Sequence, residues 1–370
     1  MQNKTTLCVY SLSHLVVDFA CFFVLMGAFS SEIGNVQLIS LGFLFYNAVA
    51  FVLQAPLGYV VDVISSSKTS KTRVSPAHFA ALGCLLVILG VMCPVLPWLR
   101  VAFCSLGNAF FHIGGGIDSL VFANGRYGRS GVFISFGALG VALGTLVGRE
   151  EQLSPWIVVL LLVICLVFIL RFCLQTKSPY QTTFNNSSAR IKTSWIVILL
   201  CAFIIIIRAA VGADKPDYIE YLSDFFIMLS ALTVFAGKFV GGLLADRFGA
   251  RIVAASSLLL SAPLLAFANS QIEVYCIGLF FFNISTSITL CVIVSHLPNN
   301  PGLSFGLTTM ALFLGNTLIS FWALPYYSRP ALVLAFVFIA ALCIYLVAAA
   351  KTTKTTTVAT SATKTNERKP

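Results

Sequence analysis

The chain has 370 residues, of which 58% are hydrophobic and 10% charged, and its formal net charge is +10. So few charged residues cannot cover the surface of a soluble domain, so the composition excludes a soluble fold and indicates that a lipid bilayer is the solvent. The basic excess does not indicate nucleic-acid binding, because the Lys and Arg residues are spread over short loops and one tail.

Twelve apolar segments follow one another along the chain, and each approaches the about 20 residues that a spanning helix needs. In the first half they cover 7–29, 36–61, 76–97, 99–123, 130–148 and 153–174, and in the second half 194–213, 222–244, 252–269, 272–295, 303–324 and 331–350. We therefore predict an all-α integral membrane protein with twelve transmembrane helices.

The same pattern predicts the domain organisation. Residues 1–174 form one six-helix bundle and 194–350 a second, and the polar stretch 175–193 is a short cytoplasmic linker between them. The tail 351–370 is rich in Thr and Lys and almost free of large apolar residues, so we expect it to be disordered in the cytoplasm.

The distribution of basic residues predicts the orientation, because cytoplasmic loops carry an excess of Lys and Arg. One side of the membrane receives 17 of the 23 basic residues, and the other side receives Arg100, Arg149, Lys215 and Arg329, while Arg208 and Lys238 lie within spans. Both termini are therefore predicted to be cytoplasmic, in a multi-pass protein of the cytoplasmic membrane.

The second half repeats features of the first at an offset of 169 to 171 residues. Residues 107–112 (GNAFFH) correspond to 278–283 (GLFFFN), and 135–137 (SFG) to 304–306 (SFG). Parallel six-helix repeats with a substrate site at the midplane between them are how one large class of transporters is built.

The cytoplasmic end of the eighth span carries the sequence GLLADRFGAR, from Gly242 to Arg251. Glycine lets two helices approach closely, and an aspartate such as Asp246 can face the positive N-terminus of a neighbouring helix. Arg247 and Arg251 could pair with that aspartate, and Gly249 permits a tight reversal. The segment resembles the signature loop of the major facilitator superfamily, which implies a conformational latch here.

A partial copy of this loop follows the second span. Gly58 and Asp62 keep the glycine and the aspartate, but the Arg-x-Gly-x-Arg continuation is missing. The sequence therefore predicts a stronger latch after the eighth span than after the second.

Two segments are similar to the fosmidomycin-resistance type of exporter within that superfamily. They are Ser13–Asp18 (SHLVVD) in the first span and Gly107–His112 (GNAFFH) in the fourth. The resemblance implies a monomeric, proton-driven exporter of small compounds with no cofactor. Uptake of a nutrient would need no different features, so both directions stay open.

Ionisable residues within spans are costly and are usually functional. Asp18 lies in the middle of the first span, with His14 one turn away on the same helix face. A buried carboxylate beside such a group can take up and release a proton as water access changes sides. We therefore predict that Asp18 and His14 act in coupling or substrate binding.

Four further polar residues complete the predicted cavity. Arg208 could pair with Asp18 across the centre or extend toward the outer surface, and Lys238 could bind substrate or extend toward the cytoplasm. His112 in the fourth span and Asn283 at the matching place in the tenth could line the cavity or form interhelical hydrogen bonds.

Two other classes of function are alternatives to a transporter. A membrane-embedded enzyme would need a metal or nucleophile motif, but His14, His78, His112 and His296 show no ligand spacing in the sequence, so no enzyme activity and no metal site are predicted. A non-transporting sensor or scaffold with the same fold is the third alternative, and it should tolerate neutralisation of Asp18.

Overall fold

The computed structural model describes residues 2–66, 74–93, 96–150, 152–174, 180–213, 224–268, 271–321 and 329–350. The predicted tail 351–370 and the start of the predicted linker, 175–179, lie outside these ranges.

The helices of the first half are α1 (Gln2–Val24), η1 (Leu25–Phe29) and α2 (Ser30–Ile33) in the first span; α3 (Val36–Asn47), η2 (Ala48–Val52) and α4 (Gln54–Ser66) in the second; and α5 (Pro76–Met92), α6 (Pro97–Ala123), α7 (Tyr127–Glu150) and α8 (Pro155–Phe168) with η3 (Ile169–Cys173) in the next four. Those of the second half are α9 (Ser194–Ala213), α10 (Asp224–Phe248), α11 (Ala250–Ala266), α12 (Ile272–His296), α13 (Pro301–Phe321) and α14 (Arg329–Val347). Within the described ranges these helices confirm the twelve predicted spans.

Their composition fits a bilayer. Eight helical segments are long and apolar enough to cross a membrane by themselves, α5 and α11 are shorter apolar helices, and α6 and α13 complete the set. Large apolar side chains remain exposed on the outside of the bundle, among them Trp156, Leu199 and Leu342, each more than 60% exposed. Such a surface is stable only where lipid covers it.

Local sequence explains how the second span bends. Pro56 has no N–H to donate to the carbonyl of Val52, four residues earlier, so the helix is interrupted there and η2 separates α3 from α4. The span therefore has an outer part, α3, and a cytoplasmic part, α4, that can follow different directions.

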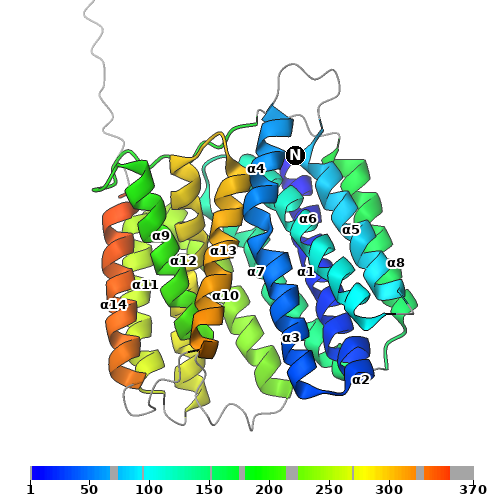
Figure 1. The fold of residues 1–370 in the computed structure, drawn as a ribbon. Coiled ribbons are helices and arrows are strands. Elements are labelled where there is room, and N and C mark those ends of the chain that lie inside the picture. Colours follow the sequence, from blue (N-terminus) through cyan, green and yellow to red (C-terminus); the bar gives the residue numbers. More distant parts are fainter. Residues whose placement is uncertain are drawn as a thin grey trace, which may run out of the picture.

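The spans of the first half and those of the second half form two groups that lie side by side (Figure 1). One apolar core contains residues of α1 and of α3 through α8. A second contains residues of α9 through α14. The two groups meet chiefly along α7 with α10 and along α4 with α13. Helix α1 begins and α14 ends at the same face of the molecule, where the backbone N–H of Arg251 donates to the carbonyl of Ala349 at 3.0 Å. The distribution of Lys and Arg predicts that this is the cytoplasmic face.

The halves touch at their cytoplasmic ends. A methyl group added to Gly302 of α13 would lie 2.5 Å from the carbonyl oxygen of Gly58, and one added to Gly242 of α10 would lie 2.8 Å from the Cα of Gly128. These helices therefore pack backbone against backbone, which only glycine permits.

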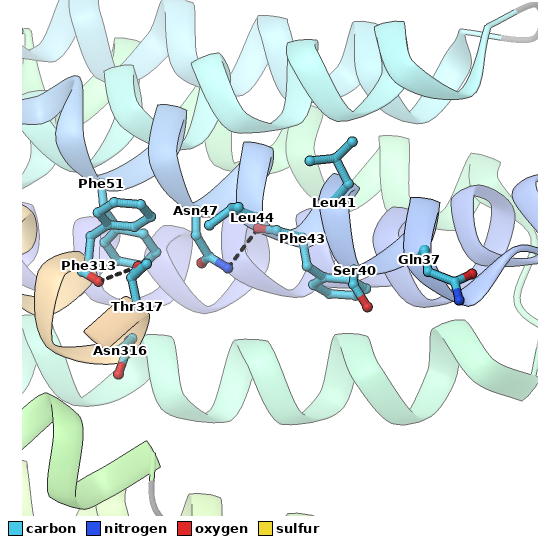
Figure 2. A pocket seen from close by; sticks show the side chains of 10 residues that line it. All are labelled: Gln37, Ser40, Leu41, Phe43, Leu44, Asn47, Phe51, Phe313, Asn316 and Thr317. Carbon is cyan, nitrogen blue, oxygen red and sulfur yellow. Dashed lines mark hydrogen bonds between the residues drawn. The ribbon is translucent and has the colours of Figure 1, made fainter. Parts of the chain in front are cut away.

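The same helix pairs separate toward the outside. A cavity of about 580 Å³ lies between α3 and the outer part of α13, lined by residues that include Asn47, Phe51 and Asn316 (Figure 2). A second cavity of about 380 Å³ lies between the outer ends of α7 and α10, beside Glu150 and Asp224. Closed at the cytoplasmic ends and separated at the outer ends, the two halves adopt an outward-facing arrangement.

Candidate functional site

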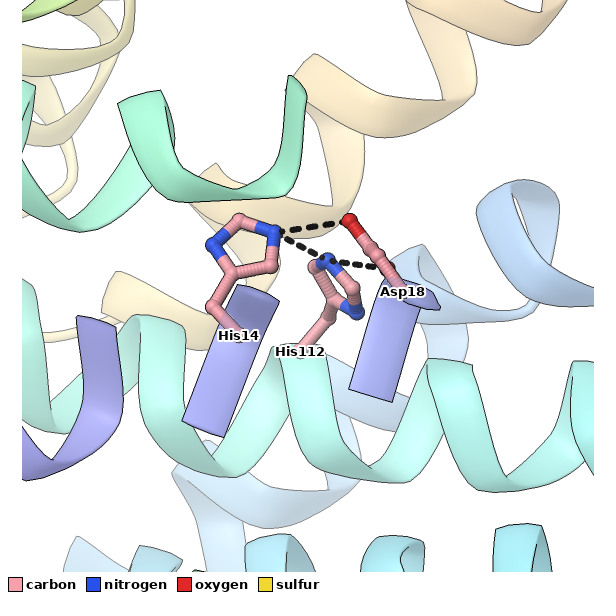
Figure 3. A group of neighbouring side chains, drawn as sticks. All are labelled: His14, Asp18 and His112. Carbon is pink, nitrogen blue, oxygen red and sulfur yellow. Dashed lines mark hydrogen bonds and ion pairs between the residues drawn. The ribbon is translucent and has the colours of Figure 1, made fainter. Parts of the chain in front are cut away.

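The ionisable residues predicted on the first and fourth spans lie together in the interior. His14, Asp18 and His112 are 5%, 7% and 7% exposed, and Figure 3 shows their side chains converging from α1 and α6. Nε2 of His14 lies 3.2 Å from Oδ2 of Asp18 and 2.9 Å from Nε2 of His112. Nε2 of His112 lies 3.8 Å from Oδ1 of Asp18. We call these three residues the triad.

Hydrogen bonds to the backbone restrict the protonation of the triad. Nδ1 of His14 lies 2.9 Å from the carbonyl oxygen of Phe133, and Nδ1 of His112 lies 2.9 Å from that of Asn108. A carbonyl oxygen only accepts, so both Nδ1 atoms carry hydrogen. In neutral imidazoles the two Nε2 atoms would then be acceptors that face each other, and they would repel.

A cation between these acceptors removes the repulsion. A proton on one Nε2 makes that imidazole positive, lets it donate to its neighbour and balances the charge of the Asp18 carboxylate. The three ligand atoms lie within 4.8 Å of one another, so one divalent ion could also contact all three. The triad is thus built to hold one positive charge, and the expectation of no metal site stays a prediction.

Asn108 also belongs to this site, although the sequence patterns do not single it out. Nδ2 of Asn108 donates to Oδ1 of Asp18 at 2.8 Å, from a position one turn before His112 on α6. The spacing of four residues between Asn108 and His112 was the available signal, because it places both side chains on the face of α6 that meets α1.

Aromatic and glycine residues cover the triad. The ring of Phe133, in the second turn of α7, lies 4.8 Å from that of His14. The ring of Phe305, in the second turn of α13, lies 6.5 Å from that of His112 and 6.1 Å from Phe133. Because Phe305 belongs to the second half, the triad lies where the two halves meet.

Gly137 of α7 packs directly on the triad, which gives a testable prediction. A methyl group there would contact Nε2 of His14 and lie 2.6 Å from Oδ2 of Asp18. Overpacking of this kind costs about 1–3 kcal/mol, so Gly137→Ala is expected to lower the melting temperature in thermal unfolding although alanine favours helix. Gly212→Ala is the control, because its methyl group would meet Phe282 at an ordinary 3.8 Å. Equal melting temperatures for the two variants would contradict this packing.

Arg208 occupies the counterpart position in the second half. Asp18 of α1 bonds to α6, the fourth span of its half, and Arg208 of α9 bonds to α12, the fourth span of the other half. Nη2 of Arg208 donates to the carbonyl of Phe282 at 3.0 Å and to Oγ1 of Thr286 at 2.5 Å. The interpretation that Arg208 pairs with Asp18 is therefore wrong for this conformation, in which Asp18 pairs with the two histidines.

The other two predicted cavity residues lie on α10 and α12. Lys238 is half-buried and interacts electrostatically with Arg208 and with Asp18. Nδ2 of Asn283 donates to the carbonyl of Leu279 on its own helix at 2.9 Å, and its Cβ packs against Gly237 of α10. Lys238 thus belongs to the ionisable centre, and Asn283 serves in helix packing here.

The loop after the eighth span binds the first half. Oδ1 of Asp246 accepts from the backbone N–H of Tyr127 at 2.8 Å, and Oδ2 accepts from that of Gly128 at 3.0 Å. Asp246 therefore caps the N-terminus of α7, where unpaired N–H groups and the helix dipole favour a carboxylate.

The other residues of this loop form contacts of their own near Asp246. Arg251 donates from Nε to the carbonyl of Ala348 at 3.0 Å and from Nη2 to that of Ser188, so the predicted pairing with Asp246 is wrong for Arg251. The guanidinium of Arg247 lies 5.3 Å from the ring centre of Phe248. Gly249 has φ +97° between α10 and α11, a conformation that side chains rarely adopt.

Asp62 of the first half forms an equivalent contact with a helix of the second half. Oδ1 accepts from the N–H of Gly302 and Oδ2 from that of Leu303, both at 2.8 Å, so Asp62 of the first half caps α13 of the second. The hydroxyl of Tyr180 also donates to Oδ1 at 2.6 Å. Burial and the Asp62 carboxylate raise the pKa of Tyr180, so the hydroxyl keeps its proton. The incomplete motif therefore still forms a helix cap, and we call the Asp62 and Asp246 contacts the two latches.

Comparison with solved structures identifies the architecture. The human organic anion transporter MFSD10 aligns with a TM-score of 0.64 and 16% identity, over 94% of this chain and 100% of that one. The E. coli fucose:proton symporter FucP gives 0.63 and 14%, over 94% and 98%. A bacterial homologue of the iron transporter ferroportin, in its outward-facing state, gives 0.59 and 15%, over 93% and 98%.

The chain has the major facilitator fold. Identities of 14–16% establish the fold alone, and no protein-family model and no curated protein sequence matches the chain. The similarity to fosmidomycin-resistance exporters stays a prediction.

Proposed function

We propose that the chain is a secondary active transporter that moves a small molecule across the cytoplasmic membrane by alternating access, coupled to protons. The observation that carries this proposal is the triad, a buried site for one positive charge at the meeting point of two six-helix halves. In folds of this kind the two halves rock about a central site.

The latches and the triad are parts of one cycle in this proposal. In the outward-facing arrangement Asp62 and Asp246 hold α13 and α7 at the cytoplasmic ends. When the latches release, Phe305 moves away from His112 with its half, and the triad gains access to the cytoplasm. A charge taken up on one side is then released on the other.

The proposal also specifies the direction of transport. Export is what the resemblance to fosmidomycin-resistance proteins implies, and the neighbours found by structure include a fucose:proton symporter, an organic anion transporter and an iron-transporter homologue. We propose proton-coupled export by a monomer that needs no cofactor, with nutrient uptake by the same fold as the alternative.

A growth-inhibition panel in an efflux-deficient bacterial host tests this proposal. Wild type, Asp18→Asn and Glu273→Gln are produced at matched membrane levels and challenged with toxic compounds of different charge. Glu273 is an exposed carboxylate at the start of α12, so its removal controls for the loss of a charge alone.

Export predicts that wild type and Glu273→Gln protect against the same compounds and that Asp18→Asn does not. Sensitisation by wild type would indicate uptake. Protection that persists in Asp18→Asn would remove the triad from the mechanism, and no effect of any variant would favour the sensor or scaffold.

A further inference from the structure

The second half carries a buried positive charge, that of Arg208, whose hydrogen-bond partners in the described part of the chain are neutral groups. Arg208 is 8% exposed, and its described contacts are the carbonyl of Phe282, the hydroxyl of Thr286 and the ring of Phe282 at 5.1 Å. All three are neutral. Among the described residues no carboxylate forms an ion pair with this guanidinium, although a buried charge normally has one.

The guanidinium also has donor capacity left over. Nε of Arg208 is buried and has no hydrogen-bond partner in the described part of the chain. A buried donor without an acceptor is destabilising, so a site of this kind is completed when a ligand supplies the acceptor. Nη2, which lies beside Nε on the guanidinium, already donates to Phe282 and Thr286, so Nε offers one further charge-assisted hydrogen bond, which an oxygen of a carboxylate or phosphate would accept.

Lys238 brings a second positive charge to the same region. Lys238 is carried by α10 and Arg208 by α9, and the charges of Arg208 and of Asp18 on α1 both act on the Lys238 ammonium. Lys238 lies well inside α10 and yet keeps part of its surface accessible. Its ammonium can therefore reach a solvated ligand, which the more deeply buried Arg208 would hold through Nε.

The triad does not neutralise this charge. The Asp18 carboxylate is engaged by His14, His112 and Asn108, and a proton on the triad cancels its charge. With the triad loaded, Arg208 and Lys238 have no ion-pair partner among the residues that the structure describes. An anion between the halves would satisfy both.

We propose that the substrate is a small organic anion, with a carboxylate or phosphate group that binds Arg208 and Lys238. This inference rests on the proposed function and names its substrate class. Arg208 supplies an oriented hydrogen bond, and Lys238 supplies a mobile point charge. Selectivity arises because a neutral analogue would leave both cations unpaired.

The test measures binding to the purified full-length chain in detergent. Succinate, citrate, benzoate and glycerol 3-phosphate are compared with dimethyl succinate, glycerol and choline at constant ionic strength. A ligand that binds the folded protein at several times its Kd stabilises it, so at least one anion is expected to raise the melting temperature by about 2–4 °C. The neutral and cationic probes should have no such effect.

Variants assign the binding site. The shift should disappear in Arg208→Gln and in Lys238→Gln, and it should persist in Lys192→Gln, which removes an exposed cation of the linker. If Arg208→Gln fails to fold, Lys238→Gln decides. The proposal is overturned if no anion gives a larger shift than its neutral analogue, or if the shift is unchanged in the variants that fold.

This test separates the substrate class from the proposed function. Anion binding through Arg208 and Lys238, combined with a panel in which no variant has an effect, would support the site and reject transport. Export of neutral compounds only, with no anion-induced shift, would support transport and reject the anion.

Discussion

Replacing Asp18 by Asn is expected to abolish transport driven by a pH gradient while the protein still inserts and folds. Asn108 can hydrogen-bond to an amide oxygen at this position, but the negative charge that balances the cation between the two imidazoles is lost. Breaking a buried ion pair by removing one partner costs about 3–5 kcal/mol, so we expect driven transport to fall by about 150- to 5,000-fold.

The measurement uses vesicles reconstituted with wild type, Asp18→Asn or Glu273→Gln and a compound found with the growth panel. Uptake is followed with and without an imposed pH gradient. Exchange of labelled for unlabelled compound is measured in parallel, and it should survive in Asp18→Asn because exchange needs no net movement of the coupling ion.

Two results would change the assignment. Undiminished pH-driven flux in Asp18→Asn would show that coupling does not depend on the triad. Loss of wild-type transport on addition of EDTA would show that a metal ion, instead of a proton, provides the positive charge.

Removing both latches is expected to shift the conformational equilibrium strongly. Loss of an N-terminal cap costs about 0.5–2 kcal/mol, and both caps hold the cytoplasmic ends together in the outward-facing arrangement. In the double variant Asp62→Ala/Asp246→Ala the population should move toward the cytoplasm-open state by about one to two orders of magnitude. Each single variant should give part of this shift, because the latches join different helix pairs.

A cysteine introduced at Asn316 reports the change, because Asn316 lines the cavity between α3 and α13. Its rate of labelling by a membrane-impermeant maleimide should fall in the double variant. The chain without Asn316→Cys measures the background from its eleven native cysteines, and Glu273→Ala controls for loss of charge. An unchanged labelling rate would mean that the aspartates do not hold this conformation.

The spans could be predicted because each one is a mainly apolar segment and the bilayer fixes its length. The gathering of His14 and Asp18 on one face followed from their spacing within a single helix. The contact between His14 and His112 could not be predicted in the same way, because it depends on how α1 and α6 rotate and approach each other.

The latches show the same limit. The complete motif identifies Asp246 as part of a latch. The incomplete motif around Asp62 predicts only a weaker latch. The structure shows that a cap needs only a carboxylate and a helix that begins nearby, and α13 begins 239 residues after Asp62 along the chain. The opposite charges of Arg208 and Asp18 suggest that they pair. In the structure, the Asp18 carboxylate instead lies beside His14 and His112 of its own half.

The glycine contacts at the cytoplasmic ends bear on the leakage of protons across the membrane. Where Gly58 meets Gly302 and Gly242 meets Gly128, the backbones approach too closely for water to enter between them. A chain of waters across this seam would let protons leak inward without carrying any substrate. If the chain transports as proposed, the same small residues that let the halves approach would also keep protons from leaking, and enlarging them is expected to dissipate the proton gradient as well as slow the cycle.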